Sequence, residues 1–223
     1  MKGPGSGTTP GFVVVEGPIG VGKTSLSRRL SESFGSDLLL EGAAENPFLE
    51  RFYQDPRAGA LPTQLFFLFQ RARQMQELRQ ADMFSPVRVA DFLMEKDRIF
   101  AELTLDDDEL RLYDQVYASL TLDAPRPDLV IYLQAPADVL MERILKRGNE
   151  METGIATEYL ERLVDSYARF FINYTASPLL IVNAAEIDPV NNDQDYELML
   201  KQVRDTSSGR HYFNPLPFEL RKK

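Results

Sequence analysis

An eight-residue loop near the start of the chain has the residue types and spacing of a phosphate-binding loop. It fits the pattern G-x-x-x-x-G-K-[ST] without a gap, and its members are Gly17, Pro18, Ile19, Gly20, Val21, Gly22, Lys23 and Thr24. Glycines let several backbone N–H groups converge on phosphate oxygens. Lys23 can reach the terminal phosphates of ATP, and the Thr24 hydroxyl can bind Mg²⁺. The chain has no N-K-x-D segment for reading guanine, which argues against a GTPase.

Three acidic residues follow apolar runs that we expect to be strands. Glu41 comes just after residues 38–40, where a carboxylate could accept the proton of an attacking hydroxyl group. Glu45 is close enough to compete for that role. Asp91 closes the run 87–90, where P-loop proteins place the acid that organises Mg²⁺. Its alternative role is a cap on the segment that follows.

A pair of arginines precedes a short polar segment bracketed by glycines. Arg143 and Arg147 are four residues apart near the end of an expected helix, so they share a face. Residues 148–154 are expected to form a mobile lid, and the two guanidinium groups could neutralise charge on a transferred phosphate. The spacing fits equally well with two solvated cations at a helix C-terminus.

Gln70 ends the otherwise apolar run 65–69. A buried amide needs hydrogen-bond partners. Gln70 could satisfy its amide on the backbone, which the residues alone favour, or offer a donor and an acceptor to a nucleobase edge.

The elements that position these residues alternate along the chain. Short apolar runs predict strands at residues 12–15, 38–40, 87–90, 129–133 and 179–182. Amphipathic or apolar segments predict helices at residues 25–34, 62–81, 106–120, 137–147, 157–174 and 193–203. This alternation predicts an α/β fold with a five-stranded parallel sheet flanked by helices. Ligands should bind beyond the carboxyl ends of the strands.

The composition excludes several classes of protein. The absence of cysteine excludes disulfide scaffolds, cysteine-ligated zinc, iron–sulfur clusters and cysteine nucleophiles. The single histidine, His211, argues against a histidine metal site or a histidine-based triad. The net charge of −9, from 25 Lys+Arg and 34 Asp+Glu, argues against a nucleic-acid polymer as partner. No apolar run approaches the ~20 residues of a membrane span, so we expect no membrane partner.

The two ends of the chain differ from the rest. Residues 1–10 are rich in Gly, Pro, Ser and Thr and lack the apolar centre of a secretory signal, which predicts a cytoplasmic protein. We expect a flexible N-terminus over residues 1–11 and a tail over residues 206–223. Residues 12–205 contain no linker long enough to mark a boundary and are expected to form a single domain.

The ordered set of motifs resembles the deoxynucleoside kinase family, and its bacterial deoxyadenosine/deoxyguanosine members most of all. The resemblance runs from about residue 12 to residue 203. It rests on GPIGVGKT at 17–24, the acid at 41, ENPFLERFY at 45–53, FFLFQ at 66–70, the acid at 91, DRIFA at 97–101, PDLVIYL at 127–133, RILKRG at 143–148, and the glutamate at 152 with EYL at 158–160. The loop at 17–24 is shared by many proteins, whereas the ordered set is far more specific.

The resemblance implies a role for each matching residue of the nucleoside site. Glu41 matches the general base for the nucleoside 5′-hydroxyl, and Tyr53 matches a tyrosine that contacts the sugar 3′-hydroxyl. Gln70 matches the glutamine that grips the base edge, and Asp97 matches an acid near the base. Glu152 matches a lid glutamate that reaches the sugar.

The resemblance also implies the architecture and the donor site. Arg143 and Arg147 match arginines of the lid, which would act on the phosphates of ATP together with Lys23. The family fold is a P-loop kinase fold with a five-stranded parallel sheet and a short arginine-containing lid. Its members are usually homodimers that pair through helices.

Three positions depart from the family pattern. Many members have an arginine directly after the acid of the third strand, where this chain has Phe92. Lys96, about one turn further, is a candidate substitute for that cation. A further lid arginine is replaced by Asn149, and the position seven after Gln70, often arginine in relatives, is Glu77.

These observations predict an ATP-dependent kinase that phosphorylates the 5′-hydroxyl of a deoxynucleoside, with purine deoxynucleosides preferred. ATP and Mg²⁺ are the expected cofactors, and Thr24 and Asp91 the expected metal ligands. One alternative is a nucleoside-monophosphate kinase, which needs extra cations for the acceptor phosphate. The other is a nucleotide-binding or scaffold subunit without catalysis, which the loss of the arginine at Phe92 motivates.

Overall fold

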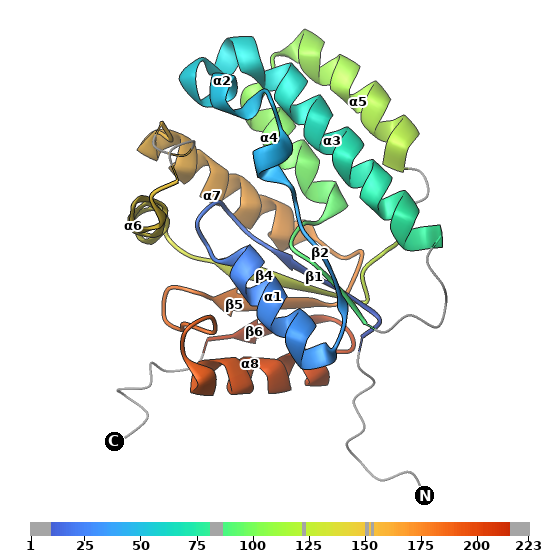
Figure 1. Ribbon diagram of the computed structural model, residues 1–223, viewed down its shortest axis with the longest axis vertical. Coiled ribbons are helices and arrows are strands. Elements are labelled where there is room, and N and C mark those ends of the chain that lie inside the picture. Colours follow the sequence, from blue (N-terminus) through green and yellow to red (C-terminus); the bar gives the residue numbers. More distant parts are fainter. Residues whose placement is uncertain (1–9, 81–86, 122–123, 150–151, 153, 215–223) are drawn as a thin grey trace, which may run out of the picture.

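A six-stranded parallel sheet forms the centre of the computed structural model, which describes residues 10–80, 87–121, 124–149, 152 and 154–214 (Figure 1). The strand order is β2-β3-β1-β4-β5-β6, and all neighbouring strands run parallel. The strands are β1 Phe12–Glu16, β2 Asp37–Leu39, β3 Arg88–Ala90, β4 Leu129–Gln134, β5 Leu179–Asn183 and β6 Arg210–Phe213. The predicted α/β class is therefore confirmed.

The sheet has one strand more than the five that the sequence predicted. β6 comes from the segment expected to be a tail, and it pairs with β5 through the register Leu179↔Arg210 to Val182↔Phe213. The residues Arg-His-Tyr-Phe do not form an apolar run, because β6 lies at the sheet edge and is only partly buried. By contrast, every residue of β1 is buried, as expected for a central strand covered on both faces.

The helices of the described residues follow the predicted pattern, with two additions. Their bounds are α1 Lys23–Phe34, α2 Leu49–Gln54, α3 Pro56–Gln80, α4 Asp97–Thr104, α5 Asp107–Thr121, α6 Ala137–Arg147, α7 Thr157–Asn173 and α8 Asp193–Asp205. Two 3₁₀ turns are η1 Ala43–Glu45 and η2 Met94–Lys96. α2 and α4 were not predicted, because 6 and 8 residues are too few for a clear helical period.

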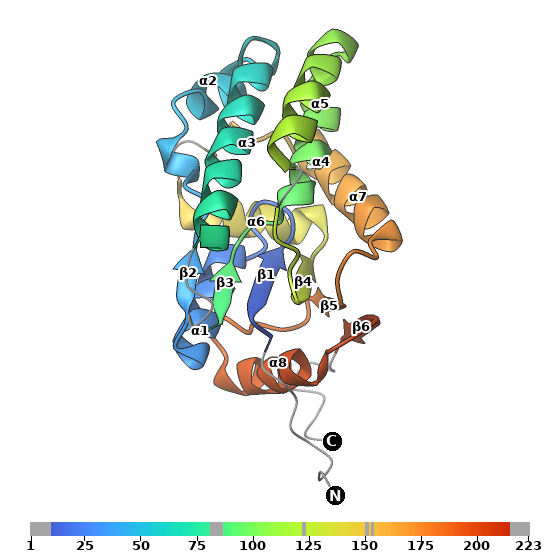
Figure 2. The same cartoon turned by 90° about the vertical axis from the view of Figure 1, so that its right-hand side faces the viewer.

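The helices form two groups around the sheet. α2, α3, α4 and α5 stand as a bundle beyond the carboxyl ends of the central strands, and α1 and α8 lie beside the sheet (Figures 1 and 2). α7 packs on β4 through rings, with Tyr132 and Phe171 stacked at a centroid distance of 4.0 Å. The aromatic side chains of α7 thus belong largely to the core.

No helix in the described part of the chain is both long and apolar enough to cross a bilayer. Residues 1–9 and 215–223, which include most of the expected flexible N-terminus and half of the expected tail, lie outside the described residues.

β6 should be an integral part of the fold, because its Arg210 caps α7. The guanidinium donates to the carbonyl oxygens of Phe171 at 2.9 Å, Ile172 at 2.9 Å and Tyr174 at 3.2 Å. We expect Arg210→Ala to lower the free energy of unfolding by about 1–3 kcal/mol, since carbonyls at the helix end lose a charged donor. Urea denaturation measures the change. Arg169→Ala, at an exposed site on α7, is the control and should change it by less than about 0.5 kcal/mol.

Candidate functional site

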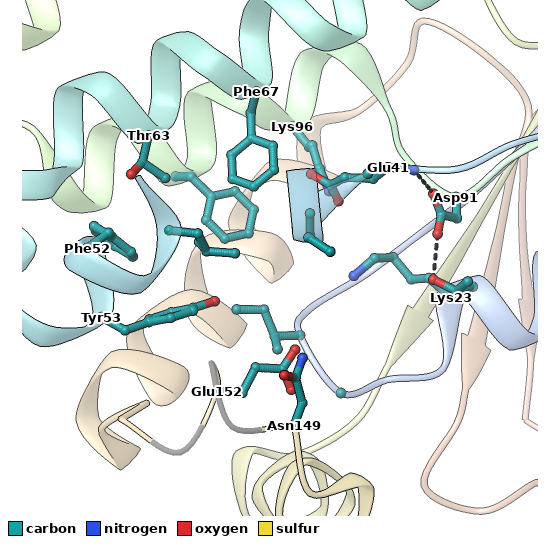
Figure 3. A pocket seen from close by; sticks show the side chains of 18 of the residues that line it. Lys23, Glu41, Phe52, Tyr53, Thr63, Phe67, Asp91, Lys96, Asn149 and Glu152 are labelled. Atoms are coloured by element: carbon teal, nitrogen blue, oxygen red, sulfur yellow. Dashed lines mark hydrogen bonds and ion pairs between the residues drawn. The ribbon is translucent and has the colours of Figure 1, made fainter. Parts of the chain in front are cut away.

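A pocket of about 370 Å³ lies between the sheet and the helix bundle (Figure 3). Its walls come from the loop after β1, the segment after β2, helices α2 and α3, the turn after β3, and the end of α6 with Asn149 and Glu152. Lys23 and Tyr53 point into it from opposite sides. The pocket lies at the carboxyl ends of the strands, as the fold class predicts.

The phosphate-binding loop joins β1 to α1 and packs closely on α6. Gly20 has a φ of 84°, and a Cβ there would lie 2.9 Å from the carbonyl oxygen of Leu140 and 2.8 Å from Cγ1 of Ile144. Only glycine fits this approach. Lys23 donates to the carbonyl oxygens of Gly17 at 2.7 Å and Pro18 at 3.2 Å. Burial, with repulsion from Lys96, lowers the pKa of Lys23 to about 8.

Asp91 ties α1 to the segment after β2. Its Oδ2 accepts a hydrogen bond from the Thr24 hydroxyl at 2.5 Å, and its Oδ1 accepts the backbone N–H of Glu41 at 2.7 Å (Figure 3). Both bonds run to other elements, so the described geometry does not make Asp91 a cap for the segment after it. A hydroxyl and a carboxylate side by side next to a phosphate-binding loop fit Mg²⁺, which takes few protein ligands. The described residues hold no cluster of three or more His, Cys, Asp or Glu side chains that could bind a metal ion.

Glu41 lies in the pocket and is held by two cations. It forms ion pairs with Arg71 and with Lys96, whose Nζ lies 3.0 Å from Oε2. Both cations are almost fully buried. Glu45, the competing acid, instead accepts a hydrogen bond from Gln70 Nε2 at 3.0 Å. The structure thus brings Glu41 and Lys23 into one pocket and leaves Glu45 outside its lining.

Gln70 does not reach the pocket, which corrects the sequence prediction. Its Nε2 donates to Glu45 and to the carbonyl oxygen of Gly42 at 3.4 Å, behind the segment that forms the wall. The pocket-lining amide of α3 is Gln64, one turn and a half earlier. Gln64 is buried and lies 3.5 Å from the Thr104 hydroxyl.

Arg71 is the functional candidate that the sequence analysis missed. It lines the pocket and forms ion pairs with both Glu41 and Asp97. Burial lowers the pKa of Arg71 to about 10. Among the described residues, its Nε and the Thr63 hydroxyl have no hydrogen-bond partner. The sequence contained a signal for Arg71. It lies seven residues after Gln64, which is the spacing expected between the glutamine and an arginine in the family.

Tyr53, Asp97 and Glu152 were also predicted to lie at the site. Tyr53 and Glu152 line the pocket, and burial raises the pKa of the Tyr53 phenol well above its usual value. Asp97, the first residue of α4, is buried and reaches the pocket only through Arg71. Glu152 forms an ion pair with Arg147. Residues 150, 151 and 153, which belong to the segment 148–154 expected to be a lid, lie outside the described residues.

A second hollow of about 530 Å³ lies on the other side of the phosphate-binding loop. It is bordered by α6 and by the segment 184–191 after β5. Arg143 lines this hollow and donates to the carbonyl oxygen of Ala184 at 2.7 Å. Arg147 lines both hollows. The phosphate-binding loop therefore lies between the two hollows.

Comparison with known proteins identifies relatives along most of the chain. The family described as deoxynucleoside kinase matches residues 13–207. Deoxyguanosine kinase of Bacillus subtilis is 36% identical over 205 residues, covering 88% of this chain and 98% of the relative. Deoxyadenosine kinase of Lactobacillus acidophilus is 30% identical over 206 residues, covering 86% of this chain and 94% of the relative.

Solved structures agree with the sequence relatives. Deoxyadenosine kinase from M. mycoides with bound dATP superposes with a TM-score of 0.75 at 26% identity, covering 86% of this chain and 98% of that chain. The same enzyme with bound dCTP has a TM-score of 0.76 at 25% identity and covers 87% and 99% of the two chains.

Phe92 fills the position at which the family resemblance led us to expect an arginine. The side chain is 0% exposed, and its ring centroid lies 5.9 Å from Cζ of Arg71. Lys96, the candidate substitute, contacts Glu41 directly. Lys96 of η2 therefore places a cation at Glu41, while an aromatic ring stands directly after Asp91.

Phe92→Arg should therefore destabilise the protein. A guanidinium would enter a closed space next to the positive charge of Arg71, and we expect a loss of roughly 3 kcal/mol or more in the free energy of unfolding. Phe92→Leu keeps an apolar side chain and should cost about 1–2 kcal/mol. Urea denaturation of the two variants compares them. Equal stability of Phe92→Arg and the parent would show that this space accepts a charge.

Proposed function

The chain belongs to the deoxynucleoside kinase family, and we propose that it transfers the γ-phosphate of ATP to the 5′-hydroxyl of a deoxynucleoside, with purine deoxynucleosides preferred. One observation carries the proposal: the Glu41 carboxylate and the Lys23 ammonium face a single pocket at the phosphate-binding loop. A proton acceptor and a phosphate-binding cation in one space are the minimum that phosphoryl transfer to an alcohol requires.

The donor would lie along the phosphate-binding loop. Backbone N–H groups of the loop and Lys23 would hold the β- and γ-phosphates, and Arg143 and Arg147 border the adjoining hollow. Thr24 and Asp91 would hold Mg²⁺, which neutralises phosphate charge when bound. Lys23 already lies against the loop carbonyls, so it is positioned before the donor arrives.

The acceptor would lie in the 370 Å³ pocket with its 5′-hydroxyl at Glu41. The hydroxyl proton passes to the Glu41 carboxylate while the oxygen bonds to the γ-phosphorus, and the bond between that phosphorus and the bridging oxygen breaks to release ADP. Arg71 and Lys96 hold the carboxylate in place. Positioning and charge neutralisation supply most of the acceleration in such reactions.

The deeper part of the pocket would recognise the nucleoside base. Gln64, Thr63 and Arg71 present polar groups there, and Phe67 of the same helix supplies an aromatic surface. Tyr53 and Glu152 would face the sugar. The preference for purines rests on the relatives, two of which are named for deoxyguanosine and deoxyadenosine.

Specific contacts argue against both alternatives. A monophosphate kinase needs cations for the acceptor phosphate, but Arg71 and Lys96 are engaged by carboxylates in the described structure. A scaffold without catalysis was motivated by the missing arginine, and Lys96 provides a cation at Glu41.

We also propose that the enzyme works in the cytoplasm, where ATP is abundant, and that it is a homodimer. Phe69 of α3 and Leu112 of α5 are 54% and 48% exposed, and these two helices lie side by side (Figure 2). Large apolar side chains on neighbouring outer helices favour pairing with a second copy.

An assay of ADP release against deoxyguanosine, deoxyadenosine, deoxycytidine and dTMP tests the proposed activity. We expect turnover with a purine deoxynucleoside and none with dTMP. ATP binding without turnover on any nucleoside would favour the scaffold, and turnover with dTMP would favour the monophosphate kinase.

Glu41→Gln should retain nucleoside binding and lose kcat by roughly 10²–10⁴-fold, because an amide cannot accept the proton. Glu45→Gln is the matched control, since Glu45 lies outside the pocket lining and bonds only to Gln70 among its described side-chain contacts. Steady-state kinetics of both variants separate the two acids. A greater loss of kcat in Glu45→Gln than in Glu41→Gln would identify Glu45 as the general base.

Gln64→Ala should raise the nucleoside KM more than it lowers kcat, because contacts to a base edge are equal in the ground state and the transition state. The ATP KM should stay unchanged. Gln70→Ala is the control and should mainly lower the melting temperature, since its amide braces Gly42 and Glu45. A rise in nucleoside KM in Gln70→Ala but not in Gln64→Ala would show that Gln70 contacts the base.

A further inference from the structure

Glu16, the last residue of β1, carries a buried carboxylate that the reaction described above does not use. Its side chain is 0% exposed and accepts three hydrogen bonds. They come from the Gly17 N–H at 2.8 Å, the Leu93 N–H at 2.7 Å and the Tyr167 hydroxyl at 3.0 Å. One carboxylate thus joins the first residue of the phosphate-binding loop to the turn after β3 and to α7.

The same carboxylate lies beside Lys96. Lys96 Nζ is 3.8 Å from Glu16 Oε1 and 3.0 Å from Glu41 Oε2, so the ammonium lies between a carboxylate in the core and one in the pocket. The Phe100 ring of α4 lies 5.6 Å from Nζ. The other charged groups that act on Lys96 are Arg71 of α3, Asp91 after β3 and Lys23 of α1.

Glu16 is the buried anion that offsets this group of cations. Burial lowers the pKa of Lys96 to about 8, and the largest opposing influence is the attraction of Glu16, which raises it. Glu16 acts in the same direction on Arg71 and Lys23. Without that charge, a fully buried ammonium would release its proton more readily.

We propose that Glu16 is a positioning residue for phosphoryl transfer, which holds Lys96 beside Glu41 and fixes the phosphate-binding loop at a set distance from that pair. The proposal rests on the proposed function, because Glu41 is taken as the base. Two observations support it without reference to the reaction: the three hydrogen bonds that Glu16 accepts, and the position of Lys96 between the carboxylates of Glu16 and Glu41.

The charged Lys96 ammonium holds Glu41 below its pKa of about 8 and releases Glu41 as pH rises through that value. The Glu16 charge raises this pKa, so it extends the range over which Glu41 is held to higher pH. In the nucleotide complex, kcat should fall as pH rises through about 8, because the orientation of Glu41 is lost.

Glu16→Gln, compared with Tyr167→Phe, tests the assignment. Both variants lose a hydrogen bond at the Glu16 carboxylate, but only the first loses the charge. We expect the alkaline limb of the kcat–pH profile to move to lower pH by about one unit in Glu16→Gln. This shift corresponds to about a threefold loss of kcat at pH 7.5, with little change in nucleoside KM. Tyr167→Phe should lower the melting temperature and leave the limb in place. An unmoved limb in Glu16→Gln, or an equal movement in both variants, would overturn the proposal.

A direct titration separates this proposal from the proposed function. ¹³C-lysine NMR of the full chain without ligands, with Lys96 assigned by Lys96→Met, should show Lys96 titrating at lower pH in Glu16→Gln than in the parent. That result supports Glu16 even if no nucleoside is phosphorylated, in which case only the proposed function fails. An unchanged Lys96 titration would contradict the role of Glu16, whatever the activity.

A double variant keeps the test decisive if Glu16→Gln is too unstable to isolate. Glu16→Gln combined with Lys96→Met removes both charges of the pair and leaves no unpaired ammonium in the core. We expect the double variant to be more stable to urea than Glu16→Gln alone, or to fold where the single variant does not. No gain from the second substitution would show that the two side chains are not coupled.

Discussion

Burying charge in a protein interior is unfavourable unless each charge has a partner, and this constraint shapes the site. Arg71 and Lys96 are buried, and Lys23 is half-buried, at the carboxyl ends of the central strands. They are balanced by carboxylates from four separate elements, namely Glu16, Glu41, Asp91 and Asp97. Because the partners come from distant parts of the chain, the charges can pair only when the sheet, the phosphate-binding loop and α3 are correctly assembled. Folding and formation of the site are therefore a single event.

The sequence predicted best what depends on local pattern. The phosphate-binding loop needs its glycines in a fixed order, and the central strands are buried on both faces, so both leave a clear signal. β6 left none, because an edge strand with one covered side can be built from polar and aromatic residues. Its position was determined by pairing with β5, a contact between residues that are about thirty positions apart.

The error at Gln70 has a different physical origin. α3 is a helix of 25 residues whose middle is apolar on every side, so periodicity could not indicate which face meets the pocket. Gln64, Phe67 and Arg71 share the pocket-facing side, and Gln70 lies to one side of it, against Gly42. The spacing of seven residues that we expect between glutamine and arginine in the family identifies the pocket-facing glutamine of α3. The short motif FFLFQ, taken alone, indicated the wrong glutamine.

Arg147 lines both the 370 Å³ pocket and the 530 Å³ hollow, and it forms an ion pair with Glu152. It therefore contacts both spaces rather than one. A side chain that responds to one occupant changes the surroundings of the other. Any such response of Arg147 would couple the two binding free energies, and linkage would make the coupling reciprocal. Whatever factor a bound donor applies to the affinity for nucleoside, a bound nucleoside applies the same factor to the affinity for the donor. The order in which the two substrates arrive cannot alter that factor.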